Sequence, residues 1–380
     1  MRVAIAGVGA RIKHVVSEFN KQIPEMEYVG YFDPMEVSFD ELTSKPVPRF
    51  NSVEEMLAES KPDLFFIGSP NNYHLEQIKA GLEANVKIFT EKPVVTSLAQ
   101  TWELAELLHK YGTSNVMVGL VLRYSQNMVD LRKAIESNQL GQIASLEASE
   151  HIAPYHGAFF MRDWRRKVSN SGGFLLEKCC HDLDVYNMLV NSRPIRVASF
   201  GGRRSFLPEL APKAGEPTEA YYEKLSIWDS AEDPFNSDAD IIDFQTAIVE
   251  YQSGASLSFH TNLNAPDEHR RFCIFGSNGM AEGDFHRGFL KITDARTNVT
   301  LVDKTYSHTG GEGVGHYGAD TEMARGIARY LKNEANCLPV SIVDALEAGI
   351  LALSIDEART TGKVIDLKPL WEKFDSYNLA

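Results

Sequence analysis

The stretch VAIAGVGARI, residues 3–12, is a short apolar run that ends in two glycines and continues into a helical pattern. Strand, glycine turn and helix in this order are the context that a dinucleotide-binding fingerprint requires. Gly7 allows the tight turn, Gly9 leaves room for a pyrophosphate, and a helix beginning near Ala10 offers free N–H groups to the phosphates. Ile12 stands where glycine or alanine is usual. A glycine pair by itself also fits any sharp turn.

A second strand pattern, residues 28–32, ends in Asp33, 24 residues after Gly9. An acid at this distance accepts hydrogen bonds from the adenosine ribose and repels a 2′-phosphate. Pro34 follows, and no arginine stands next to it to bind that phosphate. We therefore expect NAD as the cofactor and NADP as the less favoured one, although Arg11 in the glycine loop weakens this preference.

Strand and helix patterns continue to alternate over about 120 residues, with strands expected at 63–67, 86–89 and 115–120. This alternation predicts a parallel, doubly wound Rossmann sheet. Ligands of such sheets lie beyond the carboxyl ends of the strands. The residues expected in or next to those turns, and so at one cofactor site, are Gly7, Gly9, Ala10, Arg11, Asp33, Ser69, Pro70, Asn71, His74, Glu91 and Lys92.

Lys92 precedes Pro93 at the end of the strand expected over 86–89. Proline keeps the residue before it extended and makes a cis bond possible. A lysine fixed at a strand end polarises a hydroxyl or a carbonyl. The other interpretation is an exposed surface lysine, and the neighbouring dinucleotide site favours the first.

Composition limits the class of protein. The chain has 380 residues, 43% of them hydrophobic and 24% charged, which predicts two soluble globular domains. Its formal net charge of −14 argues against nucleic-acid and membrane partners. No apolar run approaches the ~20 residues that span a bilayer. The four cysteines lack CxxC spacing, so we expect reduced thiols in a cytoplasmic protein without a metal site.

The segment GGFLLEKCCHDLD, residues 172–184, concentrates ionisable side chains. After its glycine pair it predicts a helix, on which Glu177, His181 and Asp184 are spaced i, i+4 and i+7 and fall within roughly 60° of one another. Two carboxylates and an imidazole on one face are typical of a site that moves a proton from a hydroxyl. A solvated helix face with a few ion pairs has equal weight.

The rest of the chain predicts a second domain over 122–380, after a nucleotide-binding domain over 1–121, with the last helix able to pack back on the first domain. Alternating patterns with turns near 253–254 and 278–279 favour an antiparallel sheet. The polar, acidic stretch 203–240 is expected to cross the surface as a lid or a subunit contact. A last long helix, capped by Ser341, is expected to run to about residue 360.

Three further residues have two interpretations each. Trp164 and Arg165 provide an aromatic face and an oxygen-binding fork for a polyhydroxylated ligand, or they pack within a loop. His316 lies in a glycine-rich stretch that is a pocket wall or a plain interhelical loop.

Taken together, these pieces resemble the Gfo/Idh/MocA oxidoreductases, which include glucose–fructose oxidoreductase and inositol dehydrogenase. The resemblance implies an NAD(P)-binding Rossmann domain and a C-terminal α+β domain whose large, open, mostly antiparallel sheet commonly forms a dimer or tetramer interface. It also implies that Lys92 and His181 lie at the catalytic centre and that Asp184 holds the substrate. Glu177 and Cys179 replace the family's usual Asp and Gly. The matching pieces, in the family's order, are Gly7-Val8-Gly9, Asp33, Ser69-Pro70-Asn71 with His74, Glu91-Lys92-Pro93, Trp164-Arg165 and residues 172–184.

We therefore expect a cytoplasmic, homodimeric or homotetrameric NAD-dependent dehydrogenase. It would transfer a hydride between nicotinamide and a secondary hydroxyl of a sugar, polyol or inositol-like substrate. His181 would take the hydroxyl proton, Lys92 would stabilise the oxygen, and Glu177 would pair with Lys92 or orient His181. The other hydroxyls would be bound by Asp184, Arg165, Trp164 and His316. An NAD-assisted glycosidase and a non-catalytic NAD-sensing protein are the alternatives.

Overall fold

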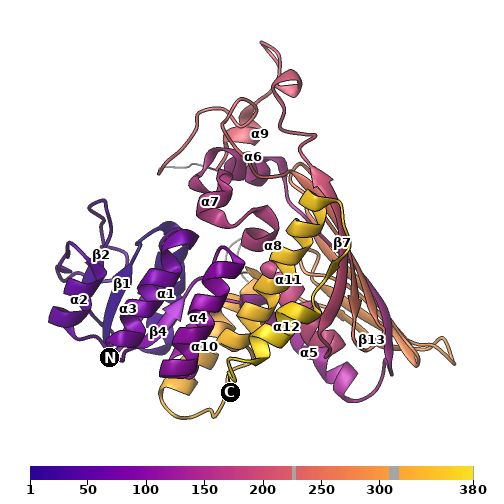
Figure 1. Ribbon diagram of the computed structural model, residues 1–380, viewed down its shortest axis with the longest axis horizontal. Helices are drawn as coiled ribbons and strands as arrows, with labels where there is room; N and C mark the ends of the chain where they lie inside the picture. The colour runs from indigo at the N-terminus through magenta and orange to yellow at the C-terminus, as the bar shows by residue number, and fades with distance from the viewer. Residues whose placement is uncertain (225–227, 308–315, 380) are drawn as a thin grey trace. The chain divides into compact units, whose positions relative to one another are not determined.

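The computed structural model describes residues 1–224, 228–307 and 316–379. The chain divides into two compact units, whose elements are labelled in Figure 1. The first unit consists of Met1–Ser125, Gly310–Gly349 and Glu372–Ala380. The second consists of Gln126–Thr309 and Ile350–Trp371.

A parallel five-stranded sheet in the order β2-β1-β3-β4-β5 forms the centre of the first unit. Its strands are β1 (Arg2–Ala6), β2 (Glu27–Phe32), β3 (Leu64–Ile67), β4 (Lys87–Thr90) and β5 (Val116–Val118). Parallel neighbours need crossover connections, and these contain α1 (Ala10–Gln22), α2 (Val53–Ser60), α3 (His74–Glu83) and α4 (Leu98–Tyr111). The strand order reverses between β1 and β3, so the prediction of a doubly wound sheet is confirmed.

Aromatic rings hold α1 on this sheet. The ring of Phe19 in α1 meets Phe66 of β3 and Phe89 of β4 edge to face, with centroids 5.1 and 5.4 Å apart. Such edge-to-face pairs add about 0.5–1.5 kcal/mol each to the burial of the rings. This packing holds α1 against β3 and β4, while the short connection after Ala6 places the amino end of α1 at the carboxyl end of β1.

The first unit also contains a later helix, α10 (Ala319–Leu331), the beginning of α11 (Ile342–Thr361) and the end of α12 (Lys368–Asp375). Helix α10 packs beside α1. Helix α11 begins with a reciprocal cap, because the backbone N–H of Asp344 donates to Ser341 Oγ at 3.1 Å and the N–H of Ser341 donates to Asp344 Oδ2 at 2.8 Å. The predicted cap is confirmed.

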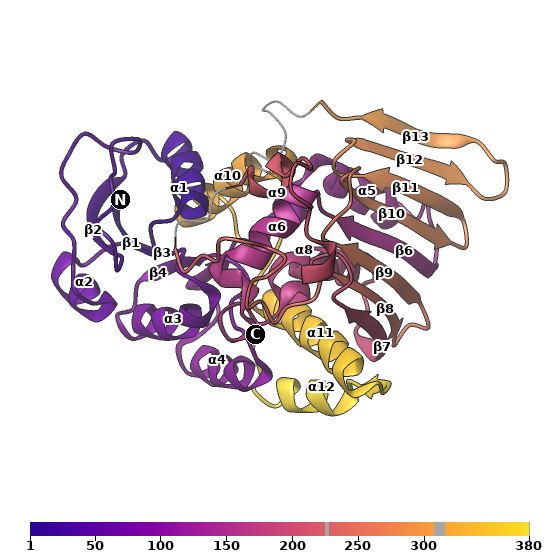
Figure 2. The same cartoon turned by 90° about the horizontal axis from the view of Figure 1, so that it is seen from above.

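The second unit is built on a nine-stranded sheet in the order β13-β12-β11-β10-β6-β9-β8-β7-β14, seen from above in Figure 2. Only the β6–β9 ladder is parallel among the strands that the structure describes there, so the predicted open, mostly antiparallel sheet is confirmed. The strands are β6 (Ile143–His151), β7 (Pro194–Gly202), β8 (Phe244–Tyr251), β9 (Ser256–Asn262), β10 (His269–Gly276), β11 (Gly279–Asp284), β12 (Phe289–Asp294), β13 (Thr300–Thr305) and β14 (Ile365–Asp366).

The two faces of this sheet differ. Helices α5 (Gln126–Glu136) and α8 (Phe174–Val190) pack on one face, against β12 and β6. Alternate residues point to the other face. There the side chains of Phe200 and Ile248 are 73% and 57% exposed, and Phe275 and Leu301 are exposed as well. This second face therefore combines regular strands with solvent-exposed apolar side chains.

The described residues of the stretch 203–240 form a small core of their own, which the polar composition did not predict. It contains α9 (Glu219–Tyr222) and an aromatic cluster in which the ring centroids of Phe206 and Phe235 are 5.5 Å apart and those of Tyr221 and Phe235 are 5.1 Å apart. Arg166 anchors the stretch by donating from Nε to Asp238 Oδ1 at 2.6 Å. None of the helices in the described part of the chain is both long and apolar enough to cross a bilayer.

Candidate functional site

The turns after β1 and β3 are adjacent at the carboxyl edge of the first sheet. Gly7 has a φ of 72°, and a Cβ added there would lie 2.3 Å from the backbone nitrogen of Ser69, so only glycine fits. An added Cβ on Gly9 would meet nothing within 4 Å. Gly9 is also the N-cap of α1 and provides no side-chain hydrogen bond to the first N–H groups of the helix. Helix amino ends of this kind bind phosphate groups in dinucleotide-binding domains.

The carboxylate of Asp33 is fixed at the end of β2. Its Oδ2 accepts from the N–H of Val8 at 2.8 Å, and its Oδ1 accepts from the N–H of Met35 at 2.9 Å. Next to it, Arg49 Nη2 donates to the carbonyl oxygens of Asp33 and Pro34 at 2.9 and 2.8 Å. The sequence predicted no arginine beside Asp33, and this prediction is wrong for the folded protein. A parallel bridge between Tyr31 and Arg49 brings this distant residue beside β2.

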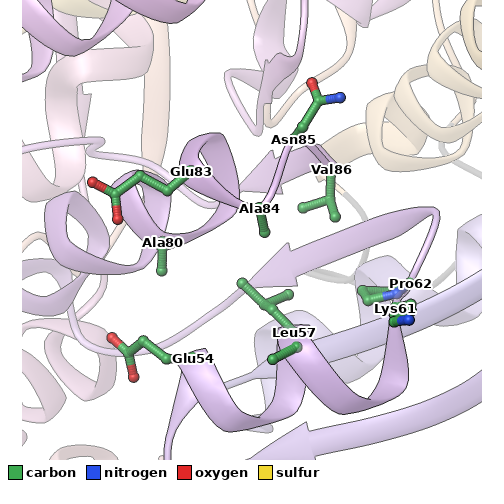
Figure 3. A pocket seen from close by; sticks show the side chains of 10 residues that line it. Glu54, Leu57, Lys61, Pro62, Ala80, Glu83, Ala84, Asn85 and Val86 are labelled. Carbon is green, nitrogen blue, oxygen red and sulfur yellow. The ribbon is translucent and has the colours of Figure 1, made fainter.

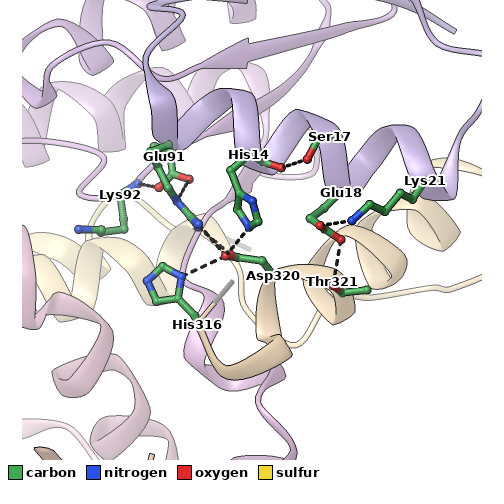
Figure 4. Close-up of polar contacts among 10 residues, drawn as sticks. His14, Ser17, Glu18, Lys21, Glu91, Lys92, His316, Asp320 and Thr321 are labelled. Atoms are coloured by element: carbon green, nitrogen blue, oxygen red, sulfur yellow. Dashed lines mark hydrogen bonds and ion pairs between the residues drawn. The ribbon is translucent and has the colours of Figure 1, made fainter. Parts of the chain in front are cut away.

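Arg11 binds two carboxylates within the first unit (Figure 4). Its Nε lies 3.0 Å from Glu91 Oε1, and its two terminal nitrogens lie 2.7 and 2.8 Å from the carboxylate oxygens of Asp320 in α10. Burial alone would lower the pKa of Arg11, but Glu91 and Asp320 outweigh it and raise that pKa. The side chain predicted to contact the cofactor is thus held between the end of β4 and the start of α10.

Three basic side chains lie next to the carboxylate of Asp320. Besides Arg11, it lies 3.3 Å from His14 Nε2 and 3.2 Å from His316 Nδ1. Burial would raise the pKa of this carboxyl, but His316 and Arg11 lower it far below its ordinary value. Asp320 carried no sequence signal as a site residue, and His316, predicted to bind substrate hydroxyls, is hydrogen-bonded to it.

Lys92 follows Glu91 directly, and the Lys92–Pro93 bond is cis, as the sequence allowed. The N–H of Lys92 donates to Glu91 Oε2 at 3.3 Å. In Figure 4 the Lys92 side chain extends away from Asp320 and His316. Glu91 therefore connects Arg11 to the backbone of the predicted catalytic lysine.

His74 links two of the turns from behind. Its Nδ1 lies 2.7 Å from the carbonyl oxygen of Pro93, and its Nε2 lies 2.8 Å from that of Ser69. The imidazole is buried, which lowers its pKa. Gln77 Nε2 donates to Ser69 Oγ at 2.9 Å. The turn of Ser69, Pro70 and the buried Asn71 is thus tied to the end of β4, where His74 positions backbone rather than facing an open space.

In the second unit, the segment 172–184 forms the start of α8. Gly172 and Gly173 have φ values of 79° and 97°, and a Cβ on Gly173 would lie 2.9 Å from Asp356 Oδ2 of α11. The helix then begins at Phe174. Its predicted polar face is buried and consists of Glu177, His181 and Asp184, so the alternative of a solvated face is wrong.

Arg165 holds the first member of this face. Its Nε donates to Glu177 Oε1 at 2.8 Å and its Nη1 to Asp163 Oδ1 at 2.7 Å. Its guanidinium also lies 4.2 Å from the ring centroid of Trp164. Burial would lower the pKa of Arg165, but Glu177 and Asp163 raise it. The expected partners of Glu177 were Lys92 or His181, and the sequence did not reveal Arg165 in this role.

An adjacent side of α8 is also ionic, which sequence reasoning missed. Arg270 Nε of β10 lies 2.6 Å from Glu150 Oε2 of β6 and 3.0 Å from Asp182 Oδ1 of α8. Lys178 Nζ lies 3.1 Å from Glu150 Oε1. Burial raises the pKa of Asp182 to about 7, against the lowering effect of Arg270. Glu150 and Arg270 occupy inward positions of their strands, and this break in the apolar alternation was the available signal.

A shallow hollow of about 630 Å³ lies elsewhere on the first unit, between α2 and α3 (Figure 3). Lys61 and Pro62 precede β3 and Val86 precedes β4, so the hollow lies at the amino ends of these strands. The cofactor turns lie at the carboxyl ends. None of the predicted site residues lines this hollow.

Comparison with known families agrees with this geometry. Residues 1–120 match the model of an oxidoreductase family with an NAD-binding Rossmann fold, and residues 128–282 match the GFO/IDH/MocA C-terminal domain. The chain belongs to the Gfo/Idh/MocA oxidoreductase family. Its first part is therefore an NAD-binding domain, and the resemblance inferred from the motifs is confirmed.

Individual relatives are distant. YteT of Bacillus subtilis (strain 168), provisionally named an oxidoreductase, is 26% identical over 324 residues, covering 72% of this chain and 76% of YteT. Inositol 2-dehydrogenase of Corynebacterium glutamicum is 22% identical over 52% of this chain, and the match spans little more than half of that enzyme, 56%. The structure of scyllo-inositol dehydrogenase from Lactobacillus casei with NAD(H) and scyllo-inositol has a TM-score of 0.74 at 16% identity, covering 97% of this chain and 99% of that one. At this identity it shows a shared fold.

Proposed function

We propose that this protein is an NAD-dependent dehydrogenase that acts on a secondary hydroxyl of a sugar, polyol or inositol-like compound. The main support is the carboxyl edge of the first sheet. An open glycine turn, a fixed Asp33 carboxylate and Lys92 follow three strands of one parallel sheet, where such sheets bind their ligands. Relatives named as inositol dehydrogenases support the substrate class.

Bound NAD would supply the hydride acceptor. In the proposed reaction His181 takes the hydroxyl proton, and the Lys92 ammonium stabilises the charge that develops on the same oxygen. Glu177, held by Arg165 at 2.8 Å, would present a fixed carboxylate next to His181 on α8. Asp184 and Trp164 would contact the remaining hydroxyls and C–H groups of the substrate.

We further propose that NAD is preferred to NADP. The Asp33 carboxylate is held by two backbone N–H groups and would accept hydrogen bonds from the ribose hydroxyls. Arg11, the only arginine of the glycine loop, is bound to Glu91 and Asp320. The exposed apolar residues on the outer face of the nine-stranded sheet support a homodimer or homotetramer.

The test is nicotinamide reduction, followed by absorbance, with purified protein, NAD and a panel of sugars, inositols and sugar acids. Lys92→Ala is the control variant, with NAD binding measured separately by fluorescence titration. Turnover in the wild type that is lost in Lys92→Ala, with NAD binding kept, is the expected result. Binding of NAD without turnover of any compound would contradict a dehydrogenase and favour the NAD-sensing alternative. Sugar release without net reduced cofactor would favour the glycosidase.

A further inference from the structure

A second cation lies near Arg165 in the second unit. Lys224, in the stretch 203–240, places its ammonium 4.4 Å from the ring centroid of Phe159 in α6 (Pro154–Arg162). The guanidinium of Arg165 lies 5.6 Å from the same centroid. Both cations therefore neighbour one aromatic ring beside Glu177 of α8.

The backbone of Lys224 is fixed to the same helix. Arg162 Nη2 donates to the carbonyl oxygen of Lys224 at 2.8 Å, and the Arg162 guanidinium lies 5.0 Å from the ring centroid of Tyr222. The neighbouring Tyr221 packs against Phe206 and Phe235. The aromatic core of the stretch and Arg162 thus hold Lys224 over α6.

Arg165 and Lys224 differ in their carboxylate partners. Arg165 has two carboxylates at hydrogen-bond distance, Asp163 and Glu177. Among the described residues no ion pair joins a carboxylate to Lys224 Nζ, which lies 4.4 Å from the ring centroid of Phe159. A cation–π contact stabilises a partly desolvated cation by only about 0.5–2 kcal/mol.

The environment therefore disfavours the ammonium. Burial, together with Lys178 and Arg165, lowers the pKa of Lys224 to about 8, while Glu177 and Asp163 oppose this shift. A partly buried cation of this kind is stabilised when an anion binds next to it. The rings of Trp164 and Phe159 in the same neighbourhood suit the C–H face of a sugar.

We propose that Lys224 binds a carboxylate of the substrate, so that the enzyme prefers uronic or aldonic acids to the corresponding neutral sugars. This inference rests on the proposed dehydrogenase function and specifies its substrate class. Lys224 selects the substrate, while Lys92 and His181 remain the groups that act on the reacting hydroxyl. The stretch 203–240 is then a specificity element.

The experiment compares neutral and acidic members of matched pairs: glucose with glucuronate, and galactose with galacturonate. KM and kcat are measured for the wild type, Lys224→Gln, Lys224→Arg and the control Lys213→Gln, an exposed lysine of the same stretch. Lys224→Gln should raise KM for the acid by about 10-fold or more, since a hydrogen bond to a charged group contributes about 1.5–3 kcal/mol. KM for the neutral sugar should change less than twofold, and Lys224→Arg should keep most of the acid preference.

The pH profile provides a readout that packing alone would not move. In the wild type, KM for the acid should rise above about pH 8 as Lys224 loses its proton. In Lys224→Arg the KM for the acid should stay constant above pH 8, because arginine keeps its charge. The neighbouring groups Lys178, Arg165, Glu177 and Asp163 are unchanged in this variant, so the difference would identify Lys224 as the titrating group. An unchanged ratio of acid to neutral KM in a folded Lys224→Gln protein would overturn the proposal.

Direct binding separates this proposal from the reaction itself. Saturation-transfer NMR with the NAD-loaded protein measures glucuronate binding whether or not turnover occurs. Binding that is lost in Lys224→Gln but kept in Lys213→Gln would support Lys224 even if no sugar were oxidised. Equal binding of glucuronate and glucose by the wild type would overturn it.

Discussion

Arg11 and Asp320 lie 309 residues apart in the sequence and are joined by two hydrogen bonds of 2.7 and 2.8 Å. The third contact of the same guanidinium is with Glu91, the residue before Lys92. The glycine loop, the end of β4 and the start of α10 therefore share one partly buried cation. Its removal would take the guanidinium away from two buried carboxylates, and Asp320 would keep only the contacts with His14 and His316.

Arg11→Met should destabilise the protein by about 2 kcal/mol, because it removes a partly exposed guanidinium from the buried carboxylates of Glu91 and Asp320. The measurement is urea unfolding. Arg132→Met is the matched control, since Arg132 pairs with Glu136 at 3.0 Å on an exposed helix face and such pairs contribute less than about 1 kcal/mol. Equal losses in the two variants would contradict the role given to Arg11.

Lys92→Ala and His181→Ala should each lower kcat by about 10²–10⁴, the usual contribution of an acid–base or charge-stabilising group. The NAD dissociation constant should change by less than threefold in His181→Ala. Steady-state kinetics and fluorescence titration measure the two quantities. If His181→Ala kept full activity, the proton would have to be taken by another group.

The sequence reveals local parts of this arrangement well. The glycine turn, Asp33, the Lys92–Pro93 pair and the face of α8 follow from short spacings within one strand or one helix. Asp320, Arg49 and the Glu150–Arg270 pair come together through contacts that cross the fold. Spacing along the chain contains no information on such distances, so the partner of a charged residue stayed hidden even where the residue itself was recognised.

Arg49 gives a prediction about cofactor choice. Asp33→Ser removes the charge that repels a 2′-phosphate, while Arg49 stays within hydrogen-bond distance of the Asp33 carbonyl oxygen. The ratio of the NADP to the NAD dissociation constant should fall at least tenfold. Adding Arg49→Gln to this variant should restore most of the ratio. If the double variant bound NADP as well as Asp33→Ser did, Arg49 would have no part in the choice.

His151 predicts a loss of stability in acid. Burial, with His269 nearby, lowers the pKa of His151 to about 4 from 6.5, and Asn262 Nδ2 donates to its Nδ1 at 3.0 Å. Between pH 6.5 and pH 4 the imidazole of His151 is protonated in the unfolded chain but neutral in the folded protein. The stability due to neutral His151 is therefore complete above pH 6.5 and is lost as the pH falls to 4.

Thermal unfolding of wild type and His151→Gln at pH 7 and pH 4.5 measures this effect. The wild type should lose on the order of 1 kcal/mol more than the variant, after an allowance for the partial exposure of the ring. The control is His109→Gln on the exposed side of α4. A pH dependence that is the same in wild type and His151→Gln would exclude the imidazole as its source.

Ile248→Asp should lower the oligomeric state without unfolding the protein. The side chain is 57% exposed on the outer face of β8, and a charge there would be buried unpaired in any interface built on that face. Light scattering after size exclusion measures the mass. Lys79→Asp on α3 of the first unit is the control. If Ile248→Asp kept the mass of the wild type, assembly would have to use another surface.

Ile12 occupies the position of the third glycine in the dinucleotide-binding fingerprint. The space for its side chain lies next to Gly68, the residue after β3. A Cβ added to Gly68 would lie 2.4 Å from the Cβ of Ile12, so the two positions share one small volume. In this chain the small residue of the pair is Gly68, in the loop after β3, and the large one is Ile12 in α1. A sequence search for dinucleotide-binding sites should therefore score positions 12 and 68 together. The glycine fingerprint of residues 3–12 lacks its third small residue, and Gly68, which faces Ile12, provides it.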